Sequence, residues 1–375
     1  MSDSVTFLER KTSCGKKIGH ASLNRPAALN ALNLDMIQLL SAQLVAWEKD
    51  PAITVVIIDG SGEKAFCAGG DVVAMHTAMA QNPGAIPARL EAFFTQEYQL
   101  DHLIHTYSKP IAVWANGIVM GGGLGLLSGA SHRIVTNSSR LAMPEISIGL
   151  YPDVGGSWFL NNMPSGCGLF LGLTGASINA ADALYVNLAD YYVSDSARDQ
   201  WLEQLENTKW SDDPDTNRAQ VSIVCSEHHL GHQTTLPDGN ISRHQDVITP
   251  LAAMHSAAEV ANAIAKLESA DDKWLRRAQQ TLSAGSPITA NLVFAQLQKG
   301  QSLTLAECFQ MELVLSCHCG EFGEFQEGVR ALMVDKDKNP AWRYPSIGAV
   351  PAEIVVWFFA SPWPESDHPL ANLRK

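Results

Sequence analysis

The sequence predicts an α/β protein in which strands, glycine-rich turns and helices alternate, followed by a helical C-terminal region. Up to about residue 206, short apolar runs of strand length alternate with segments of helical periodicity and with glycine clusters. After residue 258 only helical periodicity recurs. With 375 residues, 46% of them hydrophobic, the chain is long enough to bury a large core.

The elements of the first region follow in order along the chain. Residues 5–9 and 18–23 have the apolar pattern of two strands and predict a hairpin. Further strands are expected where short runs are mainly apolar, at 53–58, 111–114 and 133–136. Helices are expected where apolar residues recur every three or four positions, at 34–47, 89–107, 124–128, 180–188 and 194–206.

The second half of the chain has two parts of different character. Residues 207–257 show little periodicity and contain turn residues such as Asp213-Pro214. Helical spacing then returns at 260–267, 274–282, 288–298 and 303–315. We therefore divide the chain into a core of residues 1–206, an irregular connection of residues 207–257 and a helical C-terminal region of residues 258–375.

Charge and composition exclude several classes of partner. A net charge of −13 disfavours nucleic acid and anionic membrane surfaces, and no apolar run has the length of a bilayer span. The seven cysteines are scattered and odd in number, which is typical of reduced thiols. Residues 1–11 lack the apolar or Arg-rich pattern of a targeting segment. We expect a cytoplasmic protein without a nucleic-acid or membrane partner.

Two carboxylates stand close together in the middle of the chain. Glu145 follows Pro144 in an apolar stretch, so partial burial should raise its pKa, and Asp153 comes eight residues later. One carboxylate can act as nucleophile or base while the other positions water or substrate. The structural alternatives are a salt-bridged or capping Glu145 and an Asp153 that caps the helix containing Trp158.

Two glycine-rich turns lie upstream of these carboxylates. Gly69-Gly70 and the triple glycine ending at Gly123 could each be an ordinary turn or a close helix–sheet contact. Their joint occurrence with the downstream Pro-Glu favours a different function. If both turns converge, the N–H groups of Gly70 and Gly122 could stabilise an oxyanion, as acyl-group hydrolysis requires. The chain is therefore interpreted as an enzyme.

The sequence contains no convincing metal or cofactor motif. Cys317-His318-Cys319 lacks a second ligand pair, and His228 and His232 stand four apart without the glutamate of a zinc helix. No histidine pattern suggests a Ser–His–Asp triad. The triple glycine matches neither a P-loop nor a dinucleotide fingerprint, so we expect no metal and no separate cofactor.

Four motifs in a fixed order are similar to those of the crotonase (enoyl-CoA hydratase/isomerase) superfamily. They are Asn24-Arg-Pro-x-x-Leu-Asn-Ala-Leu32, Lys64-Ala-Phe-Cys-Ala-Gly-Gly-Asp71, Asn116-Gly117-x-x-x-Gly-Gly-Gly123 and Met143-Pro-Glu-x-x-Ile-Gly149. The resemblance implies an α/β fold with a crotonase-like ββα spiral core that binds acyl-coenzyme A, here carrying a helical C-terminal extension. It also implies a homo-oligomer, as a trimer or a dimer of trimers.

The resemblance also implies roles for individual residues. The thioester oxygen would lie between the N–H groups of Gly70 and Gly122, and the adenosine diphosphate part would lie near residues 25–29 and 64–68. Coenzyme A is part of the substrate. Its expected contacts are Arg25, Ala27, Leu29, Lys64, Ala68 and Gly69, with Lys336 as a phosphate ligand and Asp71 in a supporting role as a helix cap.

Within the superfamily the chain resembles the 3-hydroxyisobutyryl-CoA hydrolases. Tyr151-Pro-Asp-Val-Gly-Gly156 follows Pro144-Glu145, the C-terminal motifs are similar, and Gly125 stands where hydratases place a catalytic glutamate. By this resemblance Glu145 hydrolyses the thioester of a short 3-hydroxyacyl-CoA in valine catabolism, either by forming an anhydride or by activating water. Asp153 would contact the 3-hydroxyl group or the water. The alternatives are an enoyl-CoA hydratase or isomerase and a non-catalytic acyl-CoA-binding protein, which would need no second acid.

Overall fold

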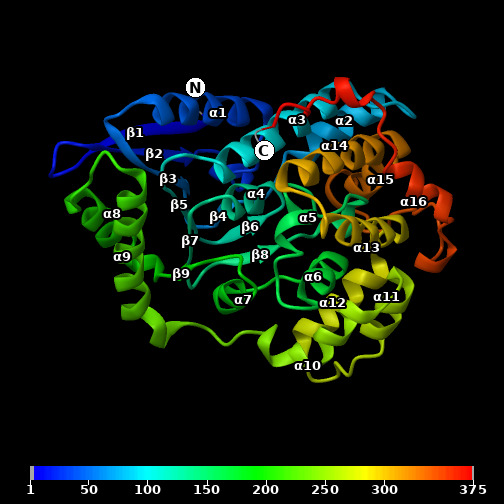
Figure 1. Ribbon diagram of the computed structural model, residues 1–375. Helices are drawn as coiled ribbons and strands as arrows, with labels where there is room; N and C mark the ends of the chain where they lie inside the picture. Colours follow the sequence, from blue (N-terminus) through cyan, green and yellow to red (C-terminus); the bar gives the residue numbers. More distant parts are fainter. Residues whose placement is uncertain (1–3, 374–375) are drawn as a thin grey trace. The chain divides into compact units, whose positions relative to one another are not determined.

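The computed structural model describes residues 4–373, so the ends of the predicted core and C-terminal region, 1–3 and 374–375, lie outside it. The chain forms two compact units (Figure 1). The first comprises the chain up to Gly70, Leu100–Leu141 and Ile178–Ser242, and the second comprises Asp71–Gln99, Ala142–Ser177 and the chain from Arg243 onward. The mixed α/β class and the helical C-terminal region are as predicted. The domain boundaries at 206 and 258 stay predictions.

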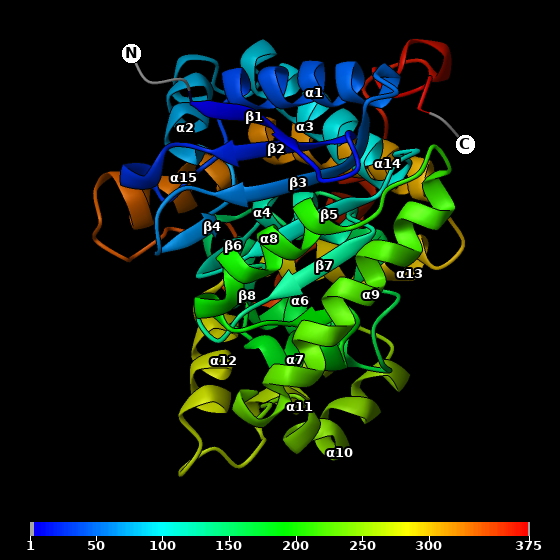
Figure 2. The same cartoon turned by 90° about the vertical axis from the view of Figure 1, so that its left-hand side faces the viewer.

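The first unit is built on a six-stranded sheet of order β1-β2-β3-β5-β7-β9 (Figure 2). β1 and β2 pair antiparallel in the predicted hairpin, and every later neighbour in this sheet is parallel. A smaller sheet has the order β4-β6-β8. The strands are β1 (Val5–Lys11), β2 (Lys17–Leu23), β3 (Ile53–Gly60), β4 (Ala65–Cys67), β5 (Ile111–Ala115), β6 (Ile118–Met120), β7 (His132–Val135), β8 (Arg140–Ala142) and β9 (Tyr191–Tyr192).

Helices α8 (Arg198–Asn207) and α9 (Pro214–His232) cover one face of the large sheet. Val55 and Ile57 of β3 and Trp114 of β5 are buried against Trp201 of α8, and the two indole rings lie 5.2 Å apart. Alternate strand residues point to the same face, which is why these three meet one helical layer. The helices of this unit are α1 (Leu34–Lys49), α4 (Gly122–Ser128), α7 (Ala180–Tyr185), α8 (Arg198–Asn207) and α9 (Pro214–His232), and α3 (Ala88–His105) crosses its boundary.

Helix α9 contradicts the prediction that residues 207–257 are irregular throughout. Asp213 is the N-cap, its side chain accepts a hydrogen bond from the N–H of Thr216, and Pro214 occupies the first turn. The Asp-Pro pair, interpreted from the sequence as a turn, therefore starts a helix. Only a narrow apolar stripe is buried, with Val221 and Val224 in the core of the first unit. A stripe this narrow among polar residues gives weak periodicity.

The second unit is mainly helical. Aromatic rings pack at its centre, where Phe94 and Tyr98 of α3 lie 5.7 Å apart and Tyr98 lies 5.9 Å from Phe309 of α14. A capping box of Thr304 and Glu307 starts α14. Its helices are α2 (Val72–Gln81), α5 (Gly156–Phe159), α6 (Cys167–Thr174), α10 (Gln245–Ile248), α11 (Ala257–Ala265), α12 (Lys273–Ala284), α13 (Pro287–Gly300), α14 (Leu305–Phe322), α15 (Glu324–Val329) and α16 (Ala352–Phe358).

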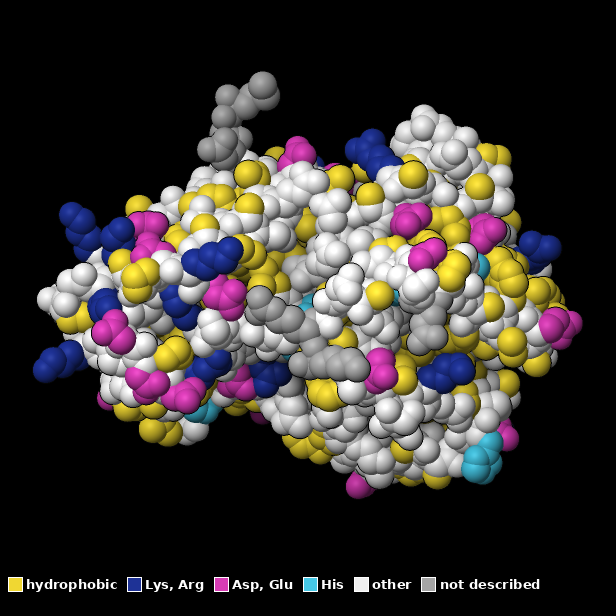
Figure 3. All heavy atoms as spheres, turned by 45° about the horizontal axis from the view of Figure 1, so that its top comes forward, with side chains coloured by type: hydrophobic (Ala, Val, Ile, Leu, Met, Phe, Trp, Pro, Cys, Tyr) yellow, Lys and Arg dark blue, Asp and Glu magenta, His cyan; other side chains and the backbone are white. Residues whose placement is uncertain are grey.

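The face of the molecule drawn in Figure 3 is mixed in charge. On the face drawn in Figure 3, Lys and Arg side chains lie among Asp and Glu side chains rather than in a patch of their own. Within residues 4–373, no helix combines the length and apolar character that crossing a membrane requires.

Candidate active site

Glu145 begins a 3-10 helix, Glu145–Ile148, directly after strand β8 and Pro144. The helix ends at Gly149, whose φ of +70° favours glycine, and a Cβ there would lie 2.4 Å from the carbonyl oxygen of Glu324. The Glu-x-x-Ile-Gly spacing thus seats the turn tightly against α15. Glu145 is only 5% exposed, and its Oε2 atom has no hydrogen-bond partner. Burial, followed by the charge of Asp153, raises the pKa of Glu145 well above its ordinary value.

Asp153 lies in the loop between this 3-10 helix and α5, and it is also buried. The Tyr98 hydroxyl donates a hydrogen bond to Asp153 Oδ2 at 2.7 Å. Burial raises the pKa of Asp153 to about 6, and the bond from Tyr98 opposes that rise. The N-cap of α5 is Gly155, so the suggestion that Asp153 caps this helix was wrong. Its carboxylate faces Tyr98 instead.

Glu97 is a third buried acid, which sequence reasoning missed. It lies on α3 next to Tyr98, is 2% exposed, and its Oε1 atom has no hydrogen-bond partner. Burial and the charge of Asp153 raise the pKa of Glu97 well above its ordinary value. The signal in the sequence was a glutamate on the buried stripe of a helix, three residues after Phe94. Buried acids with such shifts are typical of functional sites.

Helix α14 supports the Asp153 loop through two further residues that sequence reasoning missed. The Glu312 carboxylate accepts hydrogen bonds from the N–H groups of Gly155 and Ser157, both at 2.8 Å. Ser316 Oγ lies 2.6 Å from the Tyr98 hydroxyl and 2.8 Å from that of Tyr151. Burial raises the pKa of Glu312 to about 8, while the two N–H donors oppose the rise. These residues stand four apart on one face of the helix, a spacing that was the available signal.

The two glycine turns meet within the first unit. A Cβ on Gly69, where φ is +101°, would lie 3.8 Å from the nitrogen of Gly122. Gly70 forms an isolated bridge with Leu32, and Gly122 is the first residue of α4 after Gly121. The structure therefore brings the predicted donors Gly70 and Gly122 into neighbouring turns. Their role as an oxyanion hole stays a prediction.

The two segments expected to bind coenzyme A also come together in the first unit. The N–H of Ala68 donates to the carbonyl of Leu29 at 3.0 Å, and the Asn30 side chain donates to Ala65 at 2.9 Å. A cavity of about 320 Å³ opens between the segments, with Leu29, Asn30 and Lys64 among its lining residues.

The remaining residues predicted to bind coenzyme A are dispersed. Arg25 donates a hydrogen bond to the carbonyl of Ala31 at 2.6 Å, and Ala27 is exposed in the 3-10 helix Pro26–Ala28. Asp71 and Lys336 belong to the second unit. Asp71 stands at the N-cap of α2 but makes no side-chain capping bond, which corrects the predicted cap, and Lys336 is exposed with a φ of +59°.

The histidines of the two motifs, His318 and His228, contact neighbouring residues. His318 is buried in α14, where Nδ1 lies 3.0 Å from Glu321 Oε2 and Nε2 lies 2.7 Å from the carbonyl oxygen of Ala360. His228 contacts the Gln204 side chain at 2.9 Å. Among residues 4–373, no group of three or more His, Cys, Asp or Glu side chains is arranged to hold a metal ion.

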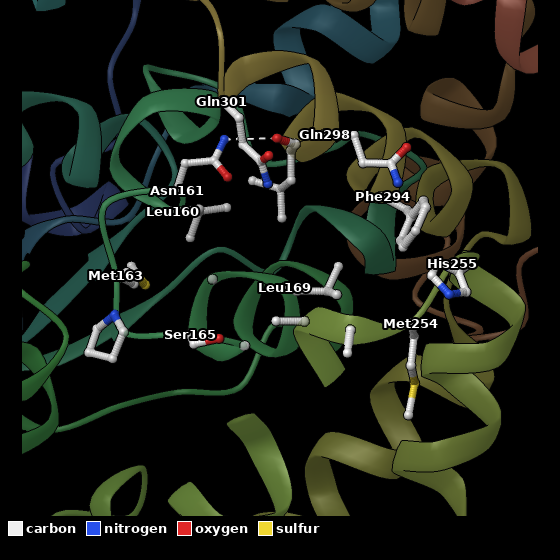
Figure 4. A pocket seen from close by; sticks show the side chains of 16 residues that line it. Leu160, Asn161, Met163, Ser165, Leu169, Met254, His255, Phe294, Gln298 and Gln301 are labelled. Atoms are coloured by element: carbon white, nitrogen blue, oxygen red, sulfur yellow. Dashed lines mark hydrogen bonds between the residues drawn. The ribbon is translucent and has the colours of Figure 1, made fainter. Parts of the chain in front are cut away.

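A larger cavity, of about 460 Å³, lies elsewhere in the second unit (Figure 4). Apolar side chains such as Met163, Leu169 and Phe294 line it together with the amides of Asn161 and Gln298. Its lining contains none of the buried acids described above and no other carboxylate. The size of a cavity therefore does not identify the catalytic site.

Comparison with known proteins agrees with the motifs and the fold. Residues 18–359 match the family described as enoyl-CoA hydratase/isomerase. A curated relative, "3-hydroxyisobutyryl-CoA hydrolase, mitochondrial" of Danio rerio, is 36% identical, with 92% of this chain and 87% of the relative covered. A crystal structure of an enoyl-CoA hydratase from Rhodobacter sphaeroides is 32% identical with a TM-score of 0.80, covering 95% of this chain and 97% of that one. "Small ribosomal subunit protein mS47" of Neurospora crassa is 34% identical, covering 88% of this chain and 66% of that protein.

The chain belongs to the enoyl-CoA hydratase/isomerase (crotonase) family. The predicted resemblance to this family and to the 3-hydroxyisobutyryl-CoA hydrolases is confirmed, and so is the crotonase-like fold class. The prediction of an enzyme of the acyl-CoA thioester hydrolase type is confirmed at the level of these relatives.

Proposed function

We propose that this protein hydrolyses the thioester of a short 3-hydroxyacyl-CoA, with 3-hydroxyisobutyryl-CoA as the preferred substrate. The reaction consumes one water and releases 3-hydroxyisobutyrate and the free thiol of coenzyme A. Relatives named as 3-hydroxyisobutyryl-CoA hydrolases, at 34–37% identity over most of the chain, support this substrate.

The proposal rests on one observation about Glu145. Glu145 is a buried carboxyl group with an unpartnered Oε2 atom, and it interacts electrostatically with a second buried acid, Asp153. A glutamate that only stabilised the fold would have a cation or donors at both oxygens, because burying an unpaired carboxylate is costly. An unpaired carboxyl group is instead available to a reacting carbon or to a water molecule.

The proposed chemistry follows from this arrangement. Ionised Glu145 attacks the thioester carbonyl carbon and the carbon–sulfur bond breaks. The thiolate leaves and takes a proton from a water molecule, which gives coenzyme A. The remaining hydroxide attacks the resulting anhydride, releases the hydroxy acid and regenerates ionised Glu145. In the second route Glu145 takes a proton from the water that attacks the thioester directly. In both routes Asp153 contacts the 3-hydroxyl group or the water.

The glycine turns and the smaller cavity supply the remaining roles. We propose the N–H groups of Gly70 and Gly122 as donors to the developing oxyanion. The segments that carry Arg25, Ala27, Leu29, Lys64, Ala68 and Gly69 would hold the adenosine diphosphate part, with Lys336 as a phosphate ligand and Asp71 as support. The cavity lined by Leu29 and Lys64 supports this placement. No metal or cofactor takes part in the proposed reaction.

Two rival functions rest on specific observations. The Rhodobacter sphaeroides structure is named as an enoyl-CoA hydratase, which favours hydration or isomerisation. Against this stands Gly125, which lies in the first turn of α4, two positions after the triple glycine. Gly125 has no carboxyl group that could act as a second acid. The relative named as a ribosomal protein favours a non-catalytic role, against which stand the unpartnered Glu145 and its acidic neighbours.

Thiol release in a colorimetric assay, with 3-hydroxyisobutyryl-CoA and crotonyl-CoA in parallel, tests the proposal. We expect free coenzyme A from the hydroxyacyl ester and none from crotonyl-CoA. Hydration or double-bond migration of crotonyl-CoA without thiol release would contradict the hydrolase function and favour the hydratase. If neither ester is changed although both bind, the protein is an acyl-CoA-binding protein.

Location, pathway and assembly are proposed together with the substrate. Among the described residues the cysteines form no disulfide bond, and all except Cys14 are buried, which supports a reducing compartment such as the cytoplasm. Several relatives are named as mitochondrial, so fractionation of the native cells should compare both locations. A role in valine breakdown and assembly into trimers or hexamers are inferred from the family, and growth on valine and light scattering test them.

A further inference from the structure

The Asp153 carboxyl group stands at one end of a buried chain of hydroxyl groups. Along it, Asp153 Oδ2 is followed by the Tyr98 hydroxyl at 2.7 Å, Ser316 Oγ at 2.6 Å and the Tyr151 hydroxyl at 2.8 Å. The Tyr151 hydroxyl donates in turn to the backbone carbonyl oxygen of Glu312. The side chains of Tyr98, Tyr151 and Ser316 are fully buried.

The chain has more contacts than hydrogens. Its four oxygen–oxygen contacts each need one hydrogen, whereas its three hydroxyl groups supply three. When Tyr98 donates to an ionised Asp153 and Tyr151 donates to the Glu312 carbonyl, Ser316 has one hydrogen for two neighbouring oxygens. One of the contacts at 2.6 and 2.8 Å then brings two lone pairs together without a hydrogen between them.

A proton on Asp153 supplies the missing hydrogen. The carboxylic acid then donates to Tyr98, Tyr98 to Ser316, Ser316 to Tyr151 and Tyr151 to the carbonyl, so every contact contains one hydrogen. We propose that this hydroxyl chain stabilises the protonated form of Asp153, and that Ser316 is thereby a positioning residue for the hydrolysis. The inference rests on the proposed function, in which Asp153 contacts the 3-hydroxyl group or the water.

The surroundings of Asp153 agree with a protonated side chain. The titratable groups that face it are Glu97 and Tyr98 from α3, Glu145 from the 3-10 helix, Tyr151 from its own loop, and Glu312 and Cys319 from α14. Every one of these described groups is an acid, so they supply no positive charge that would favour ionisation. Donation from Tyr98 to an ionised Asp153 would lower its pKa, but the shortage of hydrogens makes that arrangement costly.

Single substitutions in the hydroxyl chain should change the stability of ionised Asp153 in different directions. Ser316→Ala removes the shared neighbour, so Tyr98 can donate to an ionised Asp153 without conflict. Tyr151→Phe frees the Ser316 hydrogen for Tyr98 and has the same effect. Tyr98→Phe removes the only donor in the chain that reaches Asp153, which leaves an ionised Asp153 less stable. Tyr107→Phe is the matched control, because Tyr107 is a buried tyrosine that donates to the backbone carbonyl of Leu44, within the first unit.

Infrared spectroscopy of the full chain as a function of pH tests the proposal. The C=O stretch of protonated Asp153 is identified as the band that Asp153→Asn removes. We expect this band at pH 5, where an ordinary aspartate is ionised, in the wild-type protein and in Tyr107→Phe, with a midpoint about pH 6. Its midpoint should fall by roughly one pH unit in Ser316→Ala and Tyr151→Phe, since one hydrogen bond is worth about one pKa unit. In Tyr98→Phe the midpoint should stay at or above the wild-type value.

Absence of the band at pH 5 in the wild-type protein, or an unchanged midpoint in both Ser316→Ala and Tyr151→Phe, would overturn the proposal. The readout does not depend on turnover. A protein that shows the band but releases no thiol from any 3-hydroxyacyl-CoA refutes the proposed function and leaves the hydrogen count intact. Thiol release without the band would refute the hydrogen count and leave the proposed function intact.

Discussion

Glu312 accepts a hydrogen bond from the N–H of Gly155 at 2.8 Å, although the two residues stand 157 positions apart in the sequence. Gly155 follows Asp153 in a loop whose backbone has positive φ at Val154 (+53°) and at Gly155 itself (+88°). Such a backbone is costly for valine and persists only where its surroundings hold it. The carboxylate of Glu312, which also accepts from Ser157, supplies that support.

Replacing Glu312 should therefore affect both stability and turnover. Glu312→Ala leaves the N–H groups of Gly155 and Ser157 buried without acceptors, and we expect the free energy of unfolding to fall by roughly 2–4 kcal/mol. Turnover should fall as well, because Asp153 shifts with its loop. Glu307→Ala is the matched control, since this glutamate caps the same helix, and it should cost about 1 kcal/mol without changing turnover. Urea unfolding and thiol release measure the two effects, and equal losses in both variants would contradict the prediction.

Glu145→Gln tests the group that carries the reaction. The amide keeps the shape of the side chain but can neither attack a thioester nor take a proton from water, so we expect kcat to fall by roughly three orders of magnitude or more. Binding of coenzyme A, measured by calorimetry, should be largely unchanged. Retained thiol release in a folded Glu145→Gln variant would remove Glu145 from the mechanism.

Gly122→Pro tests the proposed oxyanion donor. Gly122 is the first residue of α4, a helix position whose N–H has no partner within the helix and where proline is common in proteins. Loss of this N–H should lower kcat by about a hundredfold to a thousandfold, with little change in thermal stability. A folded variant with kcat within about threefold of the wild type would show that the Gly122 N–H is not a donor.

Asp59 should make stability depend on pH at the acidic end. Burial opposes its ionisation, but the His20 side chain at 2.8 Å and the charge of Arg198 together lower the pKa of Asp59 from 3.8 to about 2. Because the pKa is lower in the folded than in the unfolded state, the stabilisation is present above pH 4 and is lost as pH falls toward 2. Asp59→Asn should lose roughly 2 kcal/mol at pH 7. In urea unfolding the difference from the wild type should shrink below pH 4, and a constant difference would contradict this.

The sequence predicts the local chemistry better than the packing around it. The Glu145 turn, the glycine turns and the hairpin follow from residues close together in the chain, each with a backbone requirement of its own. Glu97, Glu312 and Ser316 were missed because their importance comes from long-range contacts. Tyr98 and Ser316 stand 218 positions apart, and no local pattern marks such a pair. Helix α9 was missed for the related reason that only a narrow stripe of it meets the sheet.

The separation between the Asp153 loop and its supports also has a consequence for synthesis. The ribosome completes Asp153 long before it reaches Glu312, and α14 ends only at Phe322. During that interval the nascent polypeptide carries its candidate nucleophile and glycine turns without the partners that fix the loop. Activity should therefore begin only when the last part of the chain has been translated.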